Sequence, residues 1–164
     1  MFEDMPYAPE LTTLAYILSP DRSKVLLVHR TARDSDEQLG KYNGLGGKVE
    51  RDEDIFAAVA RELREEANIE VTQSQLRGTV SWPGFNGRDV FGFIFLVTGF
   101  TGEIPAANEE GSLAWHEVAT MMELPMWDGD RYFLPLVFDE TITQFHGTIP
   151  YEGGSSTDWR VSLL

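Results

Sequence analysis

Three glutamates, Glu62, Glu65 and Glu66, lie close together near the middle of the chain. If this segment is helical, successive residues turn by about 100°, so Glu65 and Glu66 lie to either side of Glu62 on one face. Like charges at this spacing repel each other and weaken a bare helix. A hard divalent cation, which prefers oxygen ligands, would offset the repulsion. The pattern therefore predicts a metal site; the alternative is a solvated acidic face on a surface helix.

Two neighbouring features favour the metal site. Arg61 is adjacent to Glu62 and four residues before Glu65, so its guanidinium can hold and orient a carboxylate through a forked hydrogen bond. The pair Gly46-Gly47 lies upstream, and because glycine has no Cβ, it lets backbone carbonyls approach the same place. The sequence thus supplies candidate ligands, a cation to orient them and a turn that can come close.

The glutamates must be positioned by a helix, which the sequence predicts over residues 54–67. Asp52 or Asp54 can cap its start. Apolar residues recur along one stripe at a spacing of four, namely Ile55, Val59 and Leu63. This stripe would pack on a core and leave the acidic face beside it.

Strands outnumber helices in the rest of the chain. Residue types and turn signals predict strands over residues 11–19, 24–30, 71–82, 89–100 and 113–117, with a turn at 83–87. Residues 31–42 are polar and charged, which predicts an exposed loop. A second helix is expected over residues 128–138, interrupted by Pro135, and a closing hairpin over residues 144–151 and 158–164, across 152–156. Because no repeat or interdomain linker interrupts the pattern, we expect one α+β domain over residues 1–164.

The composition limits the classes of function. The formal net charge is −14, from 13 Lys and Arg against 27 Asp and Glu, which argues against binding a nucleic-acid polymer. An acidic protein can still act on phosphates if a divalent cation lies between the two. Cysteine is absent, which excludes disulfides, thiolate zinc sites and cysteine nucleophiles. The first ten residues lack the pattern of a signal peptide and no apolar stretch is long enough to span a bilayer, so we expect a cytoplasmic protein without membrane contact.

Residues 47–69 match the Nudix box, G-x5-E-x7-R-E-U-x-E-E-x-G-U, in which U is bulky and aliphatic. The matching positions are Gly47, Glu53, Arg61, Glu62, Leu63, Glu65, Glu66 and Ile69. One position departs, because Asn68 stands where the family has glycine; Asn is the next residue best able to adopt the left-handed conformation usual after a helix. The chain therefore resembles the Nudix hydrolases, and this resemblance implies the Nudix fold, an α/β/α sandwich around a mixed β-sheet.

The resemblance also implies the ligands of a metal ion, Mg²⁺ or Mn²⁺ in its place. The implied ligands are the carboxylates of Glu62, Glu65 and Glu66 and the carbonyl of Gly46. Glu53 would pair with Arg61 and steady the loop before the helix. A further carboxylate comes from a later loop in many members, and Glu110, with Glu109 as its neighbour, matches that position best. The alternative for Glu110 is a solvated loop acid.

The resemblance implies hydrolysis of a diphosphate linkage. Metal ions neutralise and orient the diphosphate and lower the pKa of bound water. We expect Glu65 to accept the proton from that water, although the carboxylate with this role varies across the superfamily. Lys48, next to the glycines, either contacts a phosphate or is a solvated strand residue.

Outside the box, the chain is similar to the MutT-type enzymes that hydrolyse oxidised purine nucleoside triphosphates such as 8-oxo-dGTP. The similar stretches are GKYNGLGGKVE, LPMWDGDRYFLPLVFD, QFHGTIPYEG and TDWRVSLL. In that group an Asn, a Trp and one or two Asp residues surround the purine, and the matching positions here are Asn43, Trp127 and Asp130. The animal enzymes carry two adjacent acids, whereas here Gly129 precedes Asp130, and Asp128 occupies a different place.

Each of these three residues has a structural alternative. Trp127 can be a core residue that anchors the second helix. Asp130 can be an acid that favours a helix N-terminus, and Asn43 can be a turn residue before glycine. Similarly, the alternation of Phe91, Phe93 and Phe95 predicts one buried strand face rather than a platform for a base.

The sequence is compatible with three functions. The first is Mg²⁺-dependent hydrolysis of oxidised purine nucleoside triphosphates to the monophosphate and pyrophosphate, by a monomer or homodimer. The second is hydrolysis of another substrate, namely ADP-ribose, a dinucleoside polyphosphate or an ordinary nucleoside triphosphate. The third is a binding domain of the Nudix fold without catalysis. Retention of every charged position of the box argues against the third function.

Overall fold

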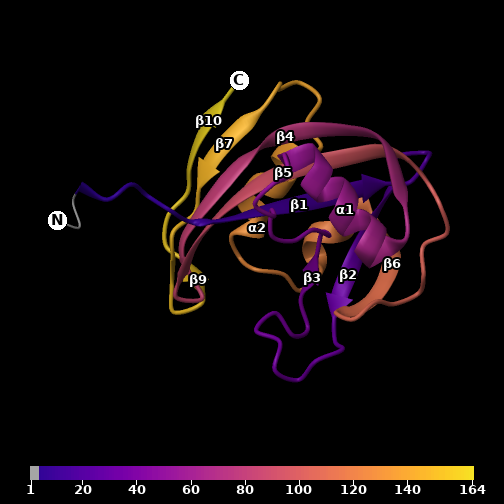
Figure 1. The fold of residues 1–164 in the computed structure, drawn as a ribbon, viewed down its shortest axis with the longest axis horizontal. Coiled ribbons are helices and arrows are strands. Elements are labelled where there is room, and N and C mark those ends of the chain that lie inside the picture. Colours follow the sequence, from indigo (N-terminus) through magenta and orange to yellow (C-terminus); the bar gives the residue numbers. More distant parts are fainter. Residues whose placement is uncertain (1–3) are drawn as a thin grey trace.

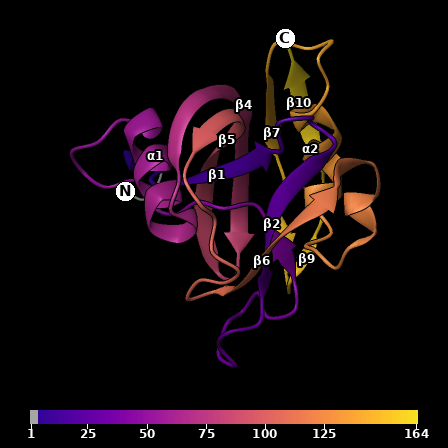
Figure 2. The same cartoon turned by 90° about the vertical axis from the view of Figure 1, so that its right-hand side faces the viewer.

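The computed structural model describes residues 4–164 as a mixed sheet with a helix on each face (Figures 1 and 2). The strands of the sheet are β1 (Glu10–Leu18), β2 (Lys24–Arg30), β3 (Tyr42–Asn43), β4 (Glu70–Phe85), β5 (Arg88–Thr101), β6 (Gly111–Glu117), β7 (Phe145–Thr148) and β10 (Arg160–Leu163). The remaining elements are α1 (Ile55–Ala67), the 3₁₀ helix η2 (Val118–Glu123), α2 (Asp130–Val137) and a small hairpin of β8 (Tyr151–Glu152) and β9 (Ser155–Ser156). The strand order is β10-β7-β4-β5-β1-β2-β3, and β6 pairs with β2. Within residues 4–164, no helix has the length and apolar character required to cross a membrane.

Helix α1 confirms the first predicted helix and its termini. The Asp54 side chain accepts a hydrogen bond from the Ala57 N–H at 2.9 Å, which caps the start. Asn68 ends the helix with φ 56° and ψ 38°, and its N–H donates to the Arg64 carbonyl. The residue that departs from the family pattern therefore adopts the left-handed conformation that glycine would adopt.

Two apolar cores lie on opposite faces of the sheet. One core packs α1 on the strands through Val59, Leu63 and Ala67. The other packs α2 on the opposite face through Phe133, Leu134 and Val137. Figure 2 shows the two helices on either side of the strands. This arrangement confirms the predicted α/β/α sandwich around a mixed sheet.

The glycine-rich segment runs beside the first half of β1. The N–H of Thr13 donates to the Gly47 carbonyl at 2.8 Å, and Leu45 and Ala15 exchange backbone hydrogen bonds at 3.0 and 2.6 Å. Gly46 has φ 156°, and a Cβ there would lie 2.0 Å from the Thr13 carbonyl oxygen, so only glycine fits. The pairing with β1 therefore fixes the backbone of the glycine turn.

Three sequence predictions need correction. The turn predicted at residues 83–87 is shorter, because β4 continues to Phe85 and only Asn86 and Gly87, both with positive φ, form the turn. The predicted loop 31–42 ends one residue earlier, where Tyr42 begins β3. The predicted second helix begins at Asp130 rather than residue 128. The closing hairpin is confirmed as β7 paired with β10, and its connection contains the extra hairpin β8–β9.

Arg77 fixes the end of α2, which contains Pro135 and stops at Val137. Its side chain is 3% exposed and donates hydrogen bonds to backbone carbonyls only. The acceptors are Leu136, Val137, Asp139, Ile142 and Thr143, at 2.6–3.2 Å. Leu136 and Val137 lie in the last turn of α2 and the other three residues follow the helix, so Arg77 holds both the helix end and the segment after it against β4.

Candidate active site

An acidic hollow of about 490 Å³ lies between α1 and the loop that precedes β6. Five carboxylates line it, those of Glu62, Glu65, Glu66, Glu109 and Glu110. Glu66 is half-buried and accepts a hydrogen bond from the Gly46 N–H at 3.1 Å. Burial, and then the nearby charges of Glu110 and Glu62, raise the pKa of Glu66 to about 9. Burial also raises the pKa of Glu110. Arg30, Arg33 and Arg61 pair with members of this set, but five carboxylates against three guanidinium groups leave a net negative charge in the hollow.

Arg61 joins the acidic helix to the glycine turn. Its guanidinium makes a fork on Glu53, with Nε–Oε2 at 3.0 Å and Nη2–Oε1 at 2.7 Å. Its Nη1 contacts Glu62 at 3.0 Å and Glu65 at 3.4 Å, and its Nη2 donates to the Lys48 carbonyl at 3.1 Å. The hydrogen bond from Arg61 lowers the pKa of Glu53 to about 2. Arg61 therefore orients the carboxylates of Glu53 and Glu62 and holds the turn against α1.

The acidic residues fit Mg²⁺ by donor type and charge. Oxygen ligands dominate the hollow, and because the raised pKa of Glu66 disfavours its ionised form near neutral pH, a bound cation would favour ionisation of all the carboxylates together. Their side chains do not converge as a finished cage, because no three Asp, Glu or His groups among residues 4–164 surround one point. Glu62 and Glu65 are instead drawn toward Arg61.

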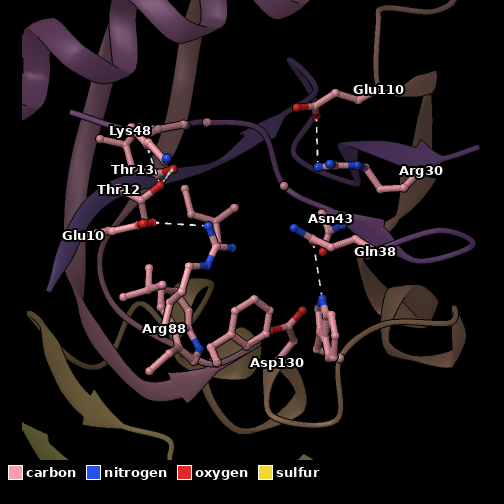
Figure 3. Close-up of a pocket in the computed structure, with 18 residues that line it drawn as sticks. Glu10, Thr12, Thr13, Arg30, Gln38, Asn43, Lys48, Arg88, Glu110 and Asp130 are labelled. Atoms are coloured by element: carbon pink, nitrogen blue, oxygen red, sulfur yellow. Dashed lines mark hydrogen bonds and ion pairs between the residues drawn. The ribbon is translucent and has the colours of Figure 1, made fainter. Parts of the chain in front are cut away.

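A cleft beside the acidic hollow, about 300 Å³ in volume, is open toward solvent (Figure 3). Its lining includes all the predicted substrate-binding residues, Asn43, Lys48, Trp127 and Asp130, together with Gly46 and Gly47. Trp82, Phe85 and Val90 supply an apolar wall. Glu110 lines both the cleft and the acidic hollow, so the two adjoin. The volume suits one nucleoside, and drug-sized ligand pockets run to about 300–1,000 Å³.

Asn43 places an unused hydrogen-bond donor in this cleft. Its Nδ2 is buried and has no hydrogen-bond partner among residues 4–164. An unsatisfied buried polar group costs about 1–3 kcal/mol. A ligand with an acceptor at this position would remove that cost.

Asp130 lies at the bottom of the cleft in Figure 3 and is half-buried. Burial raises its pKa to about 7, with Asp128 adding to the rise and the charges of Arg131 and Lys41 opposing it. The carboxyl group is therefore present in both its neutral and its ionised form near neutral pH. It can donate a hydrogen bond in the first form and only accept in the second.

Trp127 combines the two roles considered for it from the sequence. It is half-buried and packs against the α2 core, and it also lines the cleft. Its Nε1–H donates to Gln38 Oε1 at 3.3 Å, and Lys41 Nζ lies 4.6 Å from the ring centroid. The Phe85 ring meets it edge-to-face, with centroids 4.7 Å apart. The indole is thus both an anchor for α2 and a surface of the cleft.

Gly129 stands where the animal MutT-type enzymes carry an acid, and Tyr151 fills the space. A Cβ on Gly129 would lie 2.6 Å from the Tyr151 hydroxyl oxygen, which accepts a hydrogen bond from the Gly129 N–H at 3.1 Å. Asp128 points elsewhere, because its carboxylate accepts from the N–H and Oγ of Ser156. Asp128 does not line the cleft, so Asp130 is the acid that α2 contributes.

The cleft also contains polar residues that the sequence did not single out, notably Arg30 and Gln38. Arg30 precedes the loop of residues 31–41 and Gln38 lies within it, and because this loop has no periodicity, no spacing signal marks either residue. The buried strand face predicted for Phe91, Phe93 and Phe95 is confirmed only at Phe95, which is fully buried, whereas Phe91 and Phe93 are half-buried; none of the three lines the cleft.

Residues 9–137 match the family model of the NUDIX domain. The chain is 32% identical over 151 residues to an uncharacterised Nudix hydrolase, YvcI, of Bacillus subtilis, which covers 90% of this chain and 89% of that protein. It is 28% identical over 148 residues to the oxidised purine nucleoside triphosphate hydrolase of Danio rerio, covering 90% of each. It is also 32% identical over 120 residues to the CTP pyrophosphohydrolase of Escherichia coli, covering 73% of this chain and 85% of that protein.

The fold matches a solved structure as well. The crystal structure of a MutT protein from Bacillus halodurans superposes with a TM-score of 0.81 at 27% sequence identity. The superposition covers 93% of this chain and 97% of that chain. The superposition therefore covers more of the chain than residues 9–137, which the family model matches.

Proposed function

The chain belongs to the Nudix family of hydrolases, and from this premise we propose that it hydrolyses oxidised purine nucleoside triphosphates, such as 8-oxo-dGTP, to the monophosphate and pyrophosphate. The observation that carries the proposal is the cleft of nucleoside size, with the unused donor of Asn43 and the acid of Asp130, adjoining the acidic hollow at Glu110. The name of the Danio rerio relative, an oxidised purine nucleoside triphosphate hydrolase, supports it.

In the proposed complex, Asn43 and Asp130 read the edge of the base. A guanine-type base presents hydrogen-bond acceptors, which suit the Asn43 Nδ2, next to N–H donors, which suit the carboxylate of Asp130. The indole of Trp127 stacks on the base, and Trp82, Phe85 and Val90 enclose it. Because base-reading groups come from β3 and from the start of α2, the base would bridge the two elements.

The phosphate chain of the substrate would leave the cleft past Glu110 and the glycine turn. Arg30 and Lys48 line that boundary and supply positive charge for the phosphates. Glu62, Glu66, Glu110 and the Gly46 carbonyl would hold Mg²⁺, which would neutralise the diphosphate and lower the pKa of the attacking water. Arg61 and Glu53 keep the ligands and the turn in place.

Glu65 is the proposed proton acceptor. Its side chain is 59% exposed and its contact with Arg61 is long, at 3.4 Å, so it is the least constrained carboxylate of the three on α1. A carboxylate that retains access to solvent can take the proton from the attacking water while its neighbours remain ligands.

An ordinary nucleoside triphosphate is the second candidate substrate. The chain is as similar in identity to the CTP pyrophosphohydrolase as to YvcI, although over a shorter region. The cleft would also accommodate a pyrimidine, but a smaller base would leave part of the apolar wall uncovered.

The bond that is cleaved tests the proposed reaction. We expect 8-oxo-dGTP, incubated with the protein and Mg²⁺, to yield 8-oxo-dGMP and pyrophosphate in equal amounts, separated by ion-exchange chromatography. Glu62→Gln should abolish this conversion. Release of orthophosphate and the nucleoside diphosphate would contradict the proposal, as would full activity of Glu62→Gln.

A further inference from the structure

The loop between β2 and β3, residues 31–41, makes two contacts with Trp127. Gln38 Oε1 accepts the hydrogen bond of the indole Nε1–H at 3.3 Å. Lys41 Nζ lies over the ring, 4.6 Å from its centroid, in cation–π geometry. One contact fixes an edge of the indole and the other covers one face, so a base can stack only on the opposite face unless Lys41 moves. In Figure 1 this loop projects beyond the sheet before β3.

A partly buried ion pair anchors this loop. Arg30 Nε donates to Asp36 Oδ2 at 2.7 Å, and the two side chains are 18% and 9% exposed. The other oxygen of Asp36 accepts the backbone N–H of Gln38 at 3.0 Å. Burial alone would raise the pKa of Asp36, but the hydrogen bonds from Arg30 and Gln38 outweigh it and lower the pKa. Asp36 therefore holds the backbone of Gln38 as a carboxylate at neutral pH.

The ion pair of Arg30 and Asp36 is linked to Glu110, which lies at the boundary between the cleft and the acidic hollow. Arg30 Nη1 donates to Glu110 Oε2 at 3.2 Å (Figure 3). The Gly40 N–H also donates to the Arg30 carbonyl at 2.7 Å, which closes the base of the loop. Hydrogen bonds thus connect Glu110 through Arg30, Asp36 and Gln38 to the indole of Trp127.

From these contacts we propose that Gln38 is a positioning residue that fixes the plane of the Trp127 indole for stacking of the substrate base, with Asp36 fixing Gln38 in turn. The inference rests on the proposed function, because it takes the base to lie on Trp127. The physical reason is preorganisation: an indole that is already held does not lose rotational freedom when the base binds. Gln38 accordingly acts on substrate binding and leaves the chemical step to the acidic hollow.

Steady-state kinetics test whether Gln38 affects substrate binding and not the chemical step. Gln38→Leu keeps the approximate size of the side chain and removes the acceptor, and we expect KM for 8-oxo-dGTP to rise about fivefold, as loss of one hydrogen bond would give. We expect kcat to stay within about twofold. Ser35→Ala, a change on the same loop at an exposed residue, is the matched control and should leave both constants unchanged.

A double-mutant cycle distinguishes positioning of Trp127 from a general effect on the loop. In the background of Trp127→Phe, which has no indole N–H, Gln38→Leu should raise KM no further. If Gln38→Leu has the same effect on KM with and without the indole, or lowers kcat instead of raising KM, the proposal is overturned.

A second measurement does not depend on the substrate. The protein has four tryptophans, so the indole N–H resonance of Trp127 can be identified in a ¹⁵N-labelled sample by its loss in Trp127→Phe. Gln38→Leu should shift that resonance and speed its exchange with solvent, whereas Gln38→Glu, which keeps an acceptor, should preserve slow exchange. An unchanged resonance in Gln38→Leu would overturn the positioning role. Absence of 8-oxo-dGTP turnover would instead refute the proposed function, and the KM comparison would then use whichever substrate is turned over.

Discussion

Asn43 and Asp130 both lower the stability of the folded protein when no ligand is bound. The Nδ2 of Asn43 is buried without a partner among residues 4–164, and burial holds the pKa of Asp130 near 7. A native protein usually satisfies or exposes such groups, and groups that remain unsatisfied or shifted in a cleft mark a binding site. A purine between them would supply the missing acceptor and a donor to the carboxylate.

Replacing Asn43 tests whether the side chain that lowers stability also contributes to substrate binding. We expect Asn43→Leu to leave the melting temperature unchanged or slightly raised, because the variant removes an unpaired buried donor. We also expect KM for the purine triphosphate to rise about tenfold, since a good hydrogen bond to a base edge contributes about 1–3 kcal/mol. Thermal unfolding and initial rates measure the two effects. A lower melting temperature with an unchanged KM would identify Asn43 as a structural residue only.

The raised pKa of Asp130 makes the stability of the folded protein depend on pH. Its folded pKa, about 7, lies above the usual value of 3.8, so the folded protein keeps a proton that the unfolded chain releases. Its contribution to stability is therefore complete below pH 3.8 and is lost as the pH rises toward 7. We expect Asp130→Asn to melt above the parent protein at pH 8 and the difference to shrink toward pH 4.5. Equal melting temperatures of the two proteins across this range would contradict the shifted pKa.

The residues that could be predicted from the sequence are those in a spaced motif. The carboxylates of Glu62, Glu65 and Glu66 in the box, and Asn43, Trp127 and Asp130 by resemblance, line one of two adjoining hollows, whereas Glu53 of the box lines neither. Gln38 and Asp36 could not be predicted, because they belong to a polar loop and acquire partners only when the loop folds back on Arg30 and Trp127.

At the scale of elements, α1 and the glycine turn depend on one guanidinium. Arg61 contacts Glu53, Glu62, Glu65 and the Lys48 carbonyl at once, which a flexible ammonium group cannot reproduce. We expect Arg61→Lys to weaken Mg²⁺ activation about 10- to 100-fold, because groups that orient ligands have effects of this size. Magnesium titration of the hydrolysis rate measures the change. Arg64→Lys, on the same helix and paired with Glu70 at the surface, is the control.

If Arg61→Lys and Arg64→Lys reach half-maximal hydrolysis rate at the same Mg²⁺ concentration, the forked hydrogen bond of Arg61 does not organise the metal ligands. The predicted pairing of Glu53 with Arg61 would then be structural alone.

Elements differed in how far the sequence determined them. The helix α1 carries a cap, an apolar stripe and a left-handed terminal residue, and its predicted range holds to within one residue. The end of α2 depends on Arg77, whose acceptor carbonyls lie 59–66 residues away in the chain. No local pattern in β4 reveals that partnership, which exists only once β4 lies beside α2.

For the whole molecule, the net charge of −14 adds to the negative charge of the acidic hollow, which Arg30, Arg33 and Arg61 offset only in part. In the absence of metal, the raised pKa of Glu66 means that its contribution to stability is lost as the pH rises toward 9. Mg²⁺ requires the ionised carboxylate, so binding becomes more favourable over the same range. We expect the increase in melting temperature caused by Mg²⁺ to be larger at pH 9 than at pH 6.5.

Glu66→Gln should remove most of that pH dependence, whereas Glu103→Gln, an exposed residue outside the hollow, should preserve it. An equal shift in melting temperature at both pH values in the parent protein would place Mg²⁺ at carboxylates other than Glu66.

The architecture of the whole molecule was predictable because one motif identifies the family, whose fold is an α/β/α sandwich. The strand order was not, because pairs such as β1 with β5 and β4 with β7 join segments far apart in sequence. Those pairings bring β3 and the start of α2 to the same cleft, which is why the substrate-binding residues come from distant parts of the chain.

The selectivity among substrates tests the central claim most directly. Initial rates with Mg²⁺ would be compared for 8-oxo-dGTP, dGTP, CTP, ADP-ribose and diadenosine tetraphosphate. We expect kcat/KM to be highest for 8-oxo-dGTP, and Asn43→Leu to reduce that preference. A higher kcat/KM for CTP, ADP-ribose or diadenosine tetraphosphate than for 8-oxo-dGTP would contradict the assignment of the cleft to an oxidised purine.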